Sequence, residues 1–263
     1  MRTTLLDIGG TFIKCADGRQ IPIPSAGPKE AIAASLRQAA YGAERLGIAI
    51  PGPFDYRNGI FRAEHKFAAV KGESFRELAG LPADADVRFI HDVCAVLEGS
   101  IRHGQNSGNT AVVTLGTGLG FAIANKGKVR YGPTLSPADV IWNLPWEGGI
   151  LEDKVSGRGV RAIYSGLGGD ADCTARDIAE RAFHGDGAAF EAFERMGAIL
   201  GSAIAGILHE NYVETLLFAG QISQSLDLME EGLRSRLGDD ILIARAPEGA
   251  VFKGIEALFE TNQ

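Results

Sequence analysis

One pattern, a strand, a glycine turn and a second strand, occurs twice in this chain. The first copy spans residues 3–14 and turns at Gly9-Gly10-Thr11, and the second spans 111–123 and turns at Gly116-Thr117-Gly118. Glycine permits a tight turn and lets backbone N–H groups approach a ligand with no Cβ in the way. Two such turns facing each other are suited to hold a polyphosphate, and Asp7 is available for a metal ion. The pattern indicates an ATP-binding phosphotransferase built from two similar halves.

The composition is that of an acidic protein long enough for about two domains. The chain has 263 residues, 45% of them hydrophobic, with a net charge of −7 and a sequence pI of about 5.3. This charge argues against a nucleic-acid-binding surface. The first residues lack the pattern of an export signal, and the longest small-apolar stretch, 196–208, is too short to span a bilayer. We therefore expect a cytoplasmic protein that binds neither nucleic acid nor membrane.

The cysteines show neither a metal-ligand nor a disulfide pattern. Cys15, Cys94 and Cys173 are odd in number and widely separated along the chain. We expect three buried, reduced thiols and no structural zinc.

Hydrophobic periodicity predicts helices and strands in both halves. In the first half, the pattern predicts a helix over 28–46, a strand over 48–50 and a strand over 87–90 followed by a helix. In the second half, a long helix over 188–210 carries Gly197 and Gly201, which form a smooth face for close approach of another helix. Strands followed by alternating helices and strands predict an α/β fold.

A polar break at His103–Asn109 suggests where one domain ends and the next begins. We expect an N-terminal domain over 1–108 and a C-terminal domain over 109–263, with the last helix packing back on the N-terminal domain. The loop 131–149 is rich in Pro, Gly and Trp and has no periodicity. Loops this long in compact domains are usually functional.

Two aspartates lie at the ends of predicted strands, and each has two interpretations, one structural and one chemical. Asp7 ends an apolar strand, where a carboxylate is costly to bury unless it meets a cation or hydrogen-bond donors; the alternative is a turn cap. Asp92 starts a helix, so it is either the N-cap of that helix or a base that accepts a proton from a substrate hydroxyl. The chain contains no Walker-type phosphate loop, so phosphate binding requires another geometry.

Taken in order, these motifs resemble the ROK family of sugar kinases and repressors, within the sugar kinase/Hsp70/actin superfamily. Asp7-Ile-Gly-Gly-Thr11 with Lys14 is similar to the family's first phosphate motif. Leu115–Gly120 is similar to the second phosphate motif, and Phe218-Ala219-Gly220 to the adenosine motif, although Gln221 replaces a usual glycine. The resemblance implies two actin-like, ribonuclease H-like domains with a nucleotide and sugar cleft between them.

The sugar half of the site resembles the family less closely. Ile50-Pro-Gly52-Pro53 is similar to the Pro-Gly loop, and His91-Asp92 stands where the family has Asn-Asp, with the Asp as catalytic base. Leu151-Glu152 followed by Ser156-Gly157 matches a motif whose Glu binds sugar hydroxyls. The remaining sugar contacts of the family align loosely with His65, Asp139 and Trp142. The resemblance thus implies sugar binding by the following residues: Gly52, His65, His91, Asp92, Asp139 and Glu152.

One family motif is missing. The cysteine cluster that binds zinc just before Leu-Glu is absent, and Glu147-Gly148-Gly149 stands in that region. This departure puts ordinary glucose specificity in doubt.

The resemblance implies an ATP-dependent kinase that phosphorylates a hydroxyl of a hexose or hexose derivative. Mg²⁺ accompanies the ATP, with Asp7 near the metal through water. Backbone groups of both turns and Lys14 contact phosphates, Gly220 lies at the adenosine, and Asp92 takes the proton of the sugar hydroxyl. The competing interpretation is a non-catalytic or regulatory relative, although family repressors carry a DNA-binding segment before the first phosphate motif. A homodimer is left open.

Overall fold

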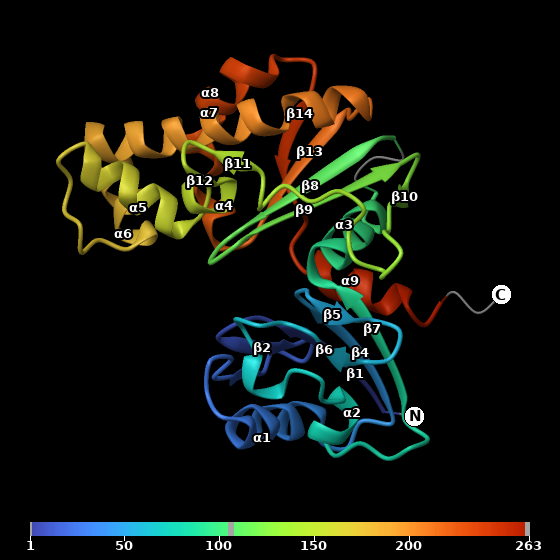
Figure 1. Ribbon diagram of the computed structural model, residues 1–263. Coiled ribbons are helices and arrows are strands. Elements are labelled where there is room, and N and C mark those ends of the chain that lie inside the picture. Colours follow the sequence, from blue (N-terminus) through green and yellow to red (C-terminus); the bar gives the residue numbers. More distant parts are fainter. Residues whose placement is uncertain (1, 105–107, 261–263) are drawn as a thin grey trace. The chain divides into compact units, whose positions relative to one another are not determined.

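The computed structural model describes residues 2–104 and 108–260, which form two compact units (Figure 1). The first unit contains the described residues of Met1–Gln105, Tyr131–Ala138 and Pro247–Gln263. The second contains those of Asn106–Arg130 and Asp139–Ala246. The polar break predicted at 103–109 includes residues 105–107, which lie outside the described residues. Each unit is described below by itself.

The first unit is built on a five-stranded sheet with the order β3-β2-β1-β4-β7 among the described residues. Its strands are β1 (Thr3–Ile8), β2 (Phe12–Cys15), β3 (Gln20–Pro22), β4 (Arg45–Ile50) and β7 (Asp86–His91). The strands β1, β2 and β3 are antiparallel neighbours, whereas β4 runs parallel to both β1 and β7. The parallel strands β1, β4 and β7 therefore end at one edge of the sheet, beside the first glycine turn.

Helices cover both faces of this sheet. They are α1 (Lys29–Ala40), α2 (Phe75–Leu78), α3 (Asp92–Arg102) and α9 (Ala250–Ala257), with a 3₁₀ turn η1 (Ala68–Val70) and the short hairpin β5 (Phe54–Asp55) and β6 (Ile60–Phe61). Figure 1 shows α1 and α2 on one side of the sheet and α3 and α9 on the other. The helices α3 and α9 cross closely, since a Cβ on Gly254 would lie 1.9 Å from the Ala95 carbonyl oxygen.

The second unit repeats the topology of the first. Its described strands have the order β10-β9-β8-β13-β14, again with an antiparallel hairpin beside parallel strands. They are β8 (Thr110–Leu115), β9 (Leu119–Asn125), β10 (Lys128–Val129), β13 (Thr215–Ala219) and β14 (Leu242–Arg245). The pattern that occurs twice in the sequence therefore corresponds to two sheets of the same topology. Each sheet has its glycine turn between two adjacent strands.

The helices of the second unit pack around its long central helix. They are α4 (Leu151–Lys154), α5 (Gly157–Gly166), α6 (Ala175–Phe183), α7 (Gly187–Glu210), η2 (Gln221–Ser225) and α8 (Leu226–Leu237), and a small hairpin joins β11 (Pro145–Trp146) to β12 (Gly149–Ile150). A Cβ on Gly197 would lie 2.3 Å from the Met229 carbonyl oxygen. This close approach of α8 to α7 confirms the smooth glycine face predicted for the long helix.

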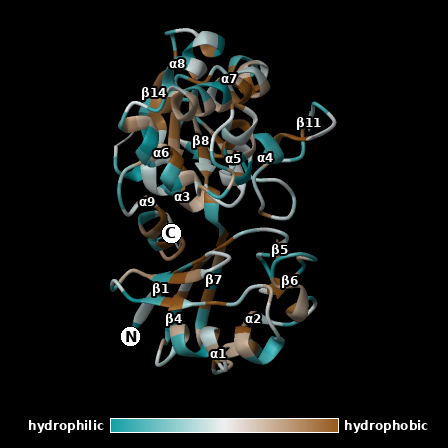
Figure 2. Cartoon of the chain, turned by 90° about the vertical axis from the view of Figure 1, so that its left-hand side faces the viewer, coloured by the Kyte–Doolittle hydropathy of each residue, from teal (hydrophilic) through white to brown (hydrophobic). Residues whose placement is uncertain are grey.

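Each unit has its own hydrophobic core. Figure 2 shows strands of both sheets in the brown of hydrophobic residues. In the first unit, Leu6 and Ile8 of β1 pack with Ile48 of β4 and Leu36 of α1. Because side chains alternate along a strand, the residues between them, including Asp7, point to the other face of the sheet. This alternation places the Asp7 carboxylate away from the α1 core.

One predicted helix is too long. The sequence favoured a helix over 28–46, but α1 ends at Ala40 and β4 begins at Arg45. Gly42 has a φ of 70°, which ends the helix. From Arg45 onward the chain pairs with β1 and β7, and the burial of Leu46 in the sheet overrides its local helical pattern, whereas Ile48 and Ile50 lie in a strand as predicted.

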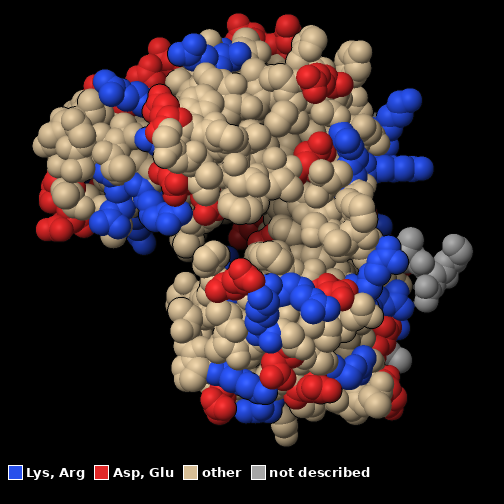
Figure 3. All heavy atoms as spheres, viewed as in Figure 1, with Lys and Arg blue, Asp and Glu red and all other residues tan. Residues whose placement is uncertain are grey.

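Charged side chains of both signs are interspersed on the visible faces of the units (Figure 3). Several form pairs four residues apart along helices, such as Arg176 with Glu180 on α6 and Arg234 with Glu230 on α8. Exposed pairs of this kind stabilise a helix by about 0.3–0.5 kcal/mol each. No helix among residues 2–104 and 108–260 is long and apolar enough to cross a membrane.

Candidate active site

Asp7 lies near the end of β1, beside the first glycine turn. It pairs in register with Lys14 of β2, and the Gly9 N–H closes the turn by donating to the Phe12 carbonyl oxygen at 2.9 Å. Burial raises the pKa of Asp7 to about 6; the negative charge of Asp92 adds to this effect and Lys14 opposes it. The two carboxylates are therefore close enough to interact, at one edge of the first sheet.

The first turn is anchored from outside its own hairpin. Ser25 Oγ donates to the Gly10 carbonyl oxygen at 2.5 Å, and the Ile23 N–H donates to the Thr11 carbonyl oxygen at 2.9 Å. A Cβ on Gly10 would lie 3.5 Å from both Cδ and Cε of Lys66. The Lys66 side chain thus lies directly over the turn, a placement that sequence reasoning missed.

Asp92 is the first residue of α3, and His91 occupies the N-cap position. Asp92 Oδ1 lies 2.7 Å from His91 Nδ1, and the Val93 N–H donates to the same oxygen at 2.7 Å. We assign a proton to Nδ1 because it lies so close to a carboxylate oxygen; the Val93 N–H also lies 3.3 Å from this nitrogen but is nearer to Asp92 Oδ1. Asp92 is therefore a carboxylate held by two donors, not the side-chain cap that was the structural alternative.

The neighbours of Asp92 set its ionisation. Loss of solvent around the carboxylate raises its pKa, but the His91 ring, the Val93 N–H and the charge of Lys66 together outweigh this effect. The pKa of Asp92 consequently lies below its usual value. The group is ionised at neutral pH, as a proton acceptor must be.

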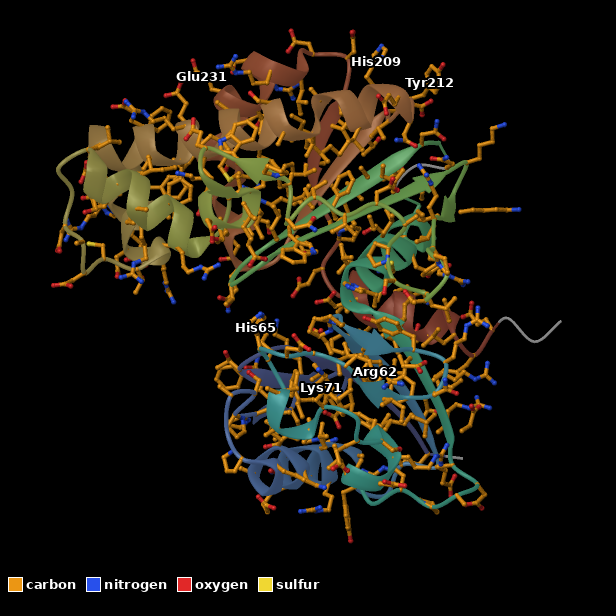
Figure 4. The ribbon with its side chains drawn as sticks, viewed as in Figure 1. Arg62, His65, Lys71, His209, Tyr212 and Glu231 are labelled. Atoms are coloured by element: carbon orange, nitrogen blue, oxygen red, sulfur yellow. The ribbon has the colours of Figure 1, made fainter. Side chains whose placement is uncertain are left out.

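The predicted Pro-Gly loop lies beside the His91 ring. A Cβ on Gly52 would be 3.4 Å from His91 Nε2 and 3.5 Å from the Tyr56 hydroxyl oxygen. The Tyr56 hydroxyl donates to the Ile50 carbonyl oxygen at 3.1 Å, and its ring packs 5.7 Å from that of His91. His65 lies on the exposed segment between β6 and η1, which also carries Arg62 (Figure 4). Gly52 and His91 are thus brought together, whereas His65 is exposed on another segment.

The second glycine turn joins β8 to β9. The Gly116 N–H donates to the Gly118 carbonyl oxygen at 3.1 Å, and the Gly157 N–H donates to the Gly116 carbonyl oxygen at 3.1 Å. Gly157 begins α5, whose N-cap Ser156 accepts a hydrogen bond from the Gly159 N–H. The Ser-Gly of the predicted sugar motif therefore supports the second turn.

Glu152 is engaged by the same turn. Its Oε2 accepts the Leu119 N–H at 2.9 Å and would lie 2.9 Å from a Cβ on Gly118. Its Oε1 lies 3.5 Å from the guanidinium of Arg158. The structure thus places this predicted sugar ligand against the second glycine turn, with a cation beside it.

Gly220 follows β13 where that strand passes the end of β8. Its φ is 89°, and a Cβ would lie 2.3 Å from the Leu115 carbonyl oxygen. Only glycine fits this position, because any side chain would displace the strand end that leads into the second turn. Gly220 therefore has a structural role in addition to its predicted place in the adenosine motif.

The loop that replaces the family's zinc region is a tight hairpin. Glu147 and Gly148 have φ of 41° and 80° and connect β11 to β12. Asp139, in the middle of the loop 131–149, has its Oδ2 3.6 Å from the guanidinium of Arg130. Trp146 packs against the second core, whereas Trp142 is 45% exposed.

The cysteines and acidic groups of the described chain form no metal cluster. Cys15, Cys94 and Cys173 are all buried and free. Among residues 2–104 and 108–260, no three His, Cys, Asp or Glu side chains converge to hold an ion. A magnesium ion that arrives with a nucleotide needs few protein ligands. Asp7 fits that role, since it is a half-buried carboxylate beside the first glycine turn and a second carboxylate, Asp92, raises its pKa further.

The family model of the ROK family matches residues 6–253, and the chain belongs to this family. It is 25% identical over 238 residues to the glucokinase of Thermotoga maritima, a match covering 80% of this chain and 75% of the relative. A Streptomyces griseus ROK glucokinase, solved with glucose and AMPPNP, matches 97% of this chain and 98% of its own with 22% identity and a TM-score of 0.78. The α/β fold is therefore the actin-like ATPase fold of ROK sugar kinases, as predicted.

A regulator of the same family also shares the fold. A ROK family transcriptional regulator, a homologue of the E. coli MLC protein, is 18% identical and has a TM-score of 0.77. The match covers 99% of this chain but 78% of the regulator.

Proposed function

We propose that this protein transfers a phosphoryl group from ATP to a hydroxyl of a hexose or hexose derivative. The observation that carries the proposal is the juxtaposition of the first glycine turn, Asp7 and Asp92 at one strand edge of the first unit. Phosphoryl transfer needs a phosphate-binding turn and an ionised base next to each other, because the acceptor hydroxyl attacks the terminal phosphorus directly.

Each residue of this constellation has a role in the proposed reaction. The Gly9 N–H closes the turn by its bond to Phe12, so the backbone N–H groups of Gly10 and Thr11 bind phosphate oxygens, and Lys14 supplies a positive charge beside them. The free Oδ2 of Asp92 accepts the proton of the attacking hydroxyl, while His91 and the Val93 N–H hold Oδ1 in place. In the second unit, the Gly116–Gly118 turn binds phosphates and Gly220 lies at the adenosine. Mg²⁺, bound with the nucleotide near Asp7, neutralises phosphate charge when present.

The sugar contacts are proposed from fewer observations. Gly52 and His91 lie next to Asp92, and the carboxylates of Glu152 and Asp139 and the ring of His65 complete the predicted set. Arg158 already pairs with Glu152, and Arg130 with Asp139. A sugar hydroxyl that binds one of these carboxylates must therefore displace the paired arginine or bind beside it.

The alternative function is a sugar-responsive or non-catalytic relative. It is favoured by the family regulator that shares the fold over 99% of this chain. The placement of Asp92 beside the first glycine turn, with one carboxylate oxygen held by His91 and the Val93 N–H, suits a proton acceptor and supports the kinase.

A coupled assay of ADP release decides between the two. The purified protein is tested with Mg-ATP against a panel of hexoses, amino sugars and their epimers. A sugar-dependent rate above the ATPase background supports the kinase. Binding of a panel sugar without turnover would contradict the kinase and support the regulator. Elemental analysis of the same preparation tests the proposed absence of structural zinc.

A further inference from the structure

Lys66 is a cation without a protein partner. It is exposed, and it forms no ion pair or hydrogen bond with any residue of 2–104 and 108–260. By contrast, Lys71 on the same segment (Figure 4) pairs with Glu64, and Lys29 pairs with Glu73. Lys66 instead has its Cδ and Cε over Gly10, 3.5 Å from where a Cβ would stand.

The backbone that carries Lys66 is held in a strained conformation. Phe67 has a φ of 61° and a ψ of 22°, the left-handed region that is uncommon for a large side chain. Its ring is 2% exposed and packs 5.5 Å from that of Phe61. Strain of this kind persists only where the surrounding structure enforces it.

The same conformation ties the Lys66 segment to the phosphate turn. The Phe67 N–H donates to the Ser25 carbonyl oxygen at 2.7 Å, and Ser25 Oγ donates to the Gly10 carbonyl oxygen. Hydrogen bonds therefore connect the first glycine turn to Ser25, and Ser25 to Phe67. Lys66 keeps its place over Gly10 because its own backbone is bonded to the residue that anchors the turn.

The positive charge of Lys66 also acts on Asp92, the proposed base. It is one of the groups that keep the pKa of Asp92 low, after His91 and the Val93 N–H. The ammonium group thus acts on Asp92 while its stem lies over Gly10.

We propose that Lys66 is a catalytic residue that binds the phosphoryl group during its transfer. This inference rests on the proposed kinase activity. As the acceptor oxygen forms a bond to the γ-phosphorus, the bond from that phosphorus to the bridging oxygen breaks and ADP leaves with the electron pair. The acceptor proton passes to Asp92. The equatorial oxygens of the phosphoryl group carry negative charge throughout, and Lys66 donates to one of them.

A charge in this position acts on the rate and not on binding. Lys66→Met keeps the length and apolar stem of the side chain, so the turn and the fold should be unaffected. We expect kcat to fall by roughly 10²-fold or more with KM for ATP and sugar nearly unchanged, as when a single donor to a developing charge is removed. Lys66→Arg restores a cation and should recover part of the rate.

The matched control is Lys71→Met, which removes a lysine of the same segment that pairs with Glu64. It should leave kcat and KM at wild-type values. Calorimetric binding gives a second readout without turnover. Lys66→Met should weaken binding of ADP with aluminium fluoride in the presence of sugar, a mimic of the transferring group, and leave binding of ADP alone unchanged.

The outcomes separate this inference from the function on which it rests. Wild type without turnover on any panel sugar contradicts the kinase, and the inference falls with it. An active wild type whose Lys66→Met variant keeps its kcat overturns the inference alone. An increase in KM for the sugar without a change in kcat also overturns it, and assigns Lys66 to an anionic acceptor.

Discussion

His91 Nδ1 lies 2.7 Å from Asp92 Oδ1, so an imidazole holds the carboxylate that we propose as the base. The ring is fixed in turn by Tyr56 and by the close approach of Gly52. His91 therefore orients Asp92 and favours its ionised form. This arrangement differs from the Asn-Asp pair of the family that the sequence resembles.

Asp92→Asn tests the base itself. The amide keeps the size of the side chain and cannot accept the proton of the attacking hydroxyl. We expect kcat to fall by roughly 10²-fold or more with little change in the free energy of unfolding. Steady-state kinetics and urea denaturation measure the two quantities. A near-normal kcat in the variant would rule out Asp92 as the base.

His91→Asn tests the pairing. Asparagine is a good N-cap, so α3 should keep its start. His91 lowers the pKa of Asp92, and its loss should let that pKa rise. Because the base must be ionised, the acidic limb of the kcat profile at saturating Mg-ATP should move to higher pH. An unchanged acidic limb would show that His91 does not tune Asp92.

Asp7→Asn should separate stability from activity. The pKa of Asp7 is raised from 3.8 to about 6, so the folded state binds more protons than the unfolded state between these values. Stability of the nucleotide-free protein therefore falls as pH rises through this window, by up to about 3 kcal/mol. The amide does not ionise, and the variant should be more stable than wild type at pH 7.5.

Urea denaturation at several pH values tests this expectation. The stability gain of Asp7→Asn should shrink toward zero as the pH approaches the unfolded pKa of 3.8. Stabilisation by Mg-ATP should be smaller in the variant, since the carboxylate near the metal is lost. A variant that is less stable at neutral pH would contradict the burial argument.

The repeated sheets could be predicted because glycine turns and strand alternation are local signals. The end of α1 could not, since the pairing of Leu46 with β1 overrides its helical context. Lys66 was missed because it belongs to no motif and lies in a segment without periodicity. Its place over Gly10 depends on Ser25 and Phe67, which are brought together only by the fold.

Gly220→Ala tests whether the end of β13 needs glycine. A Cβ would lie 2.3 Å from the Leu115 carbonyl oxygen, and the φ of 89° is strained for alanine. We expect a loss of about 1–3 kcal/mol in the free energy of unfolding. Gly185→Ala is the matched control for backbone strain without a steric contact, because its φ is 92° and no atom would lie within 4 Å of the added Cβ. Equal losses in the two variants would show that the contact with β8 contributes nothing.

Trp142→His tests how the loop before α4 sets the choice of sugar. The indole of Trp142 is 45% exposed, and the residue is fixed because its carbonyl oxygen accepts the Glu152 N–H at 3.0 Å. An indole stacks on a pyranose ring but cannot accept a hydroxyl proton as a neutral imidazole can. We expect wild type to prefer a hexose other than glucose or a hexose derivative, and the variant to change the ranking of kcat/KM across the panel. Trp146→Phe, within the packed part of the same loop, should preserve the ranking. Glucose as the clear favourite of wild type, with the same ranking in Trp142→His, would show that Trp142 takes no part in sugar selection.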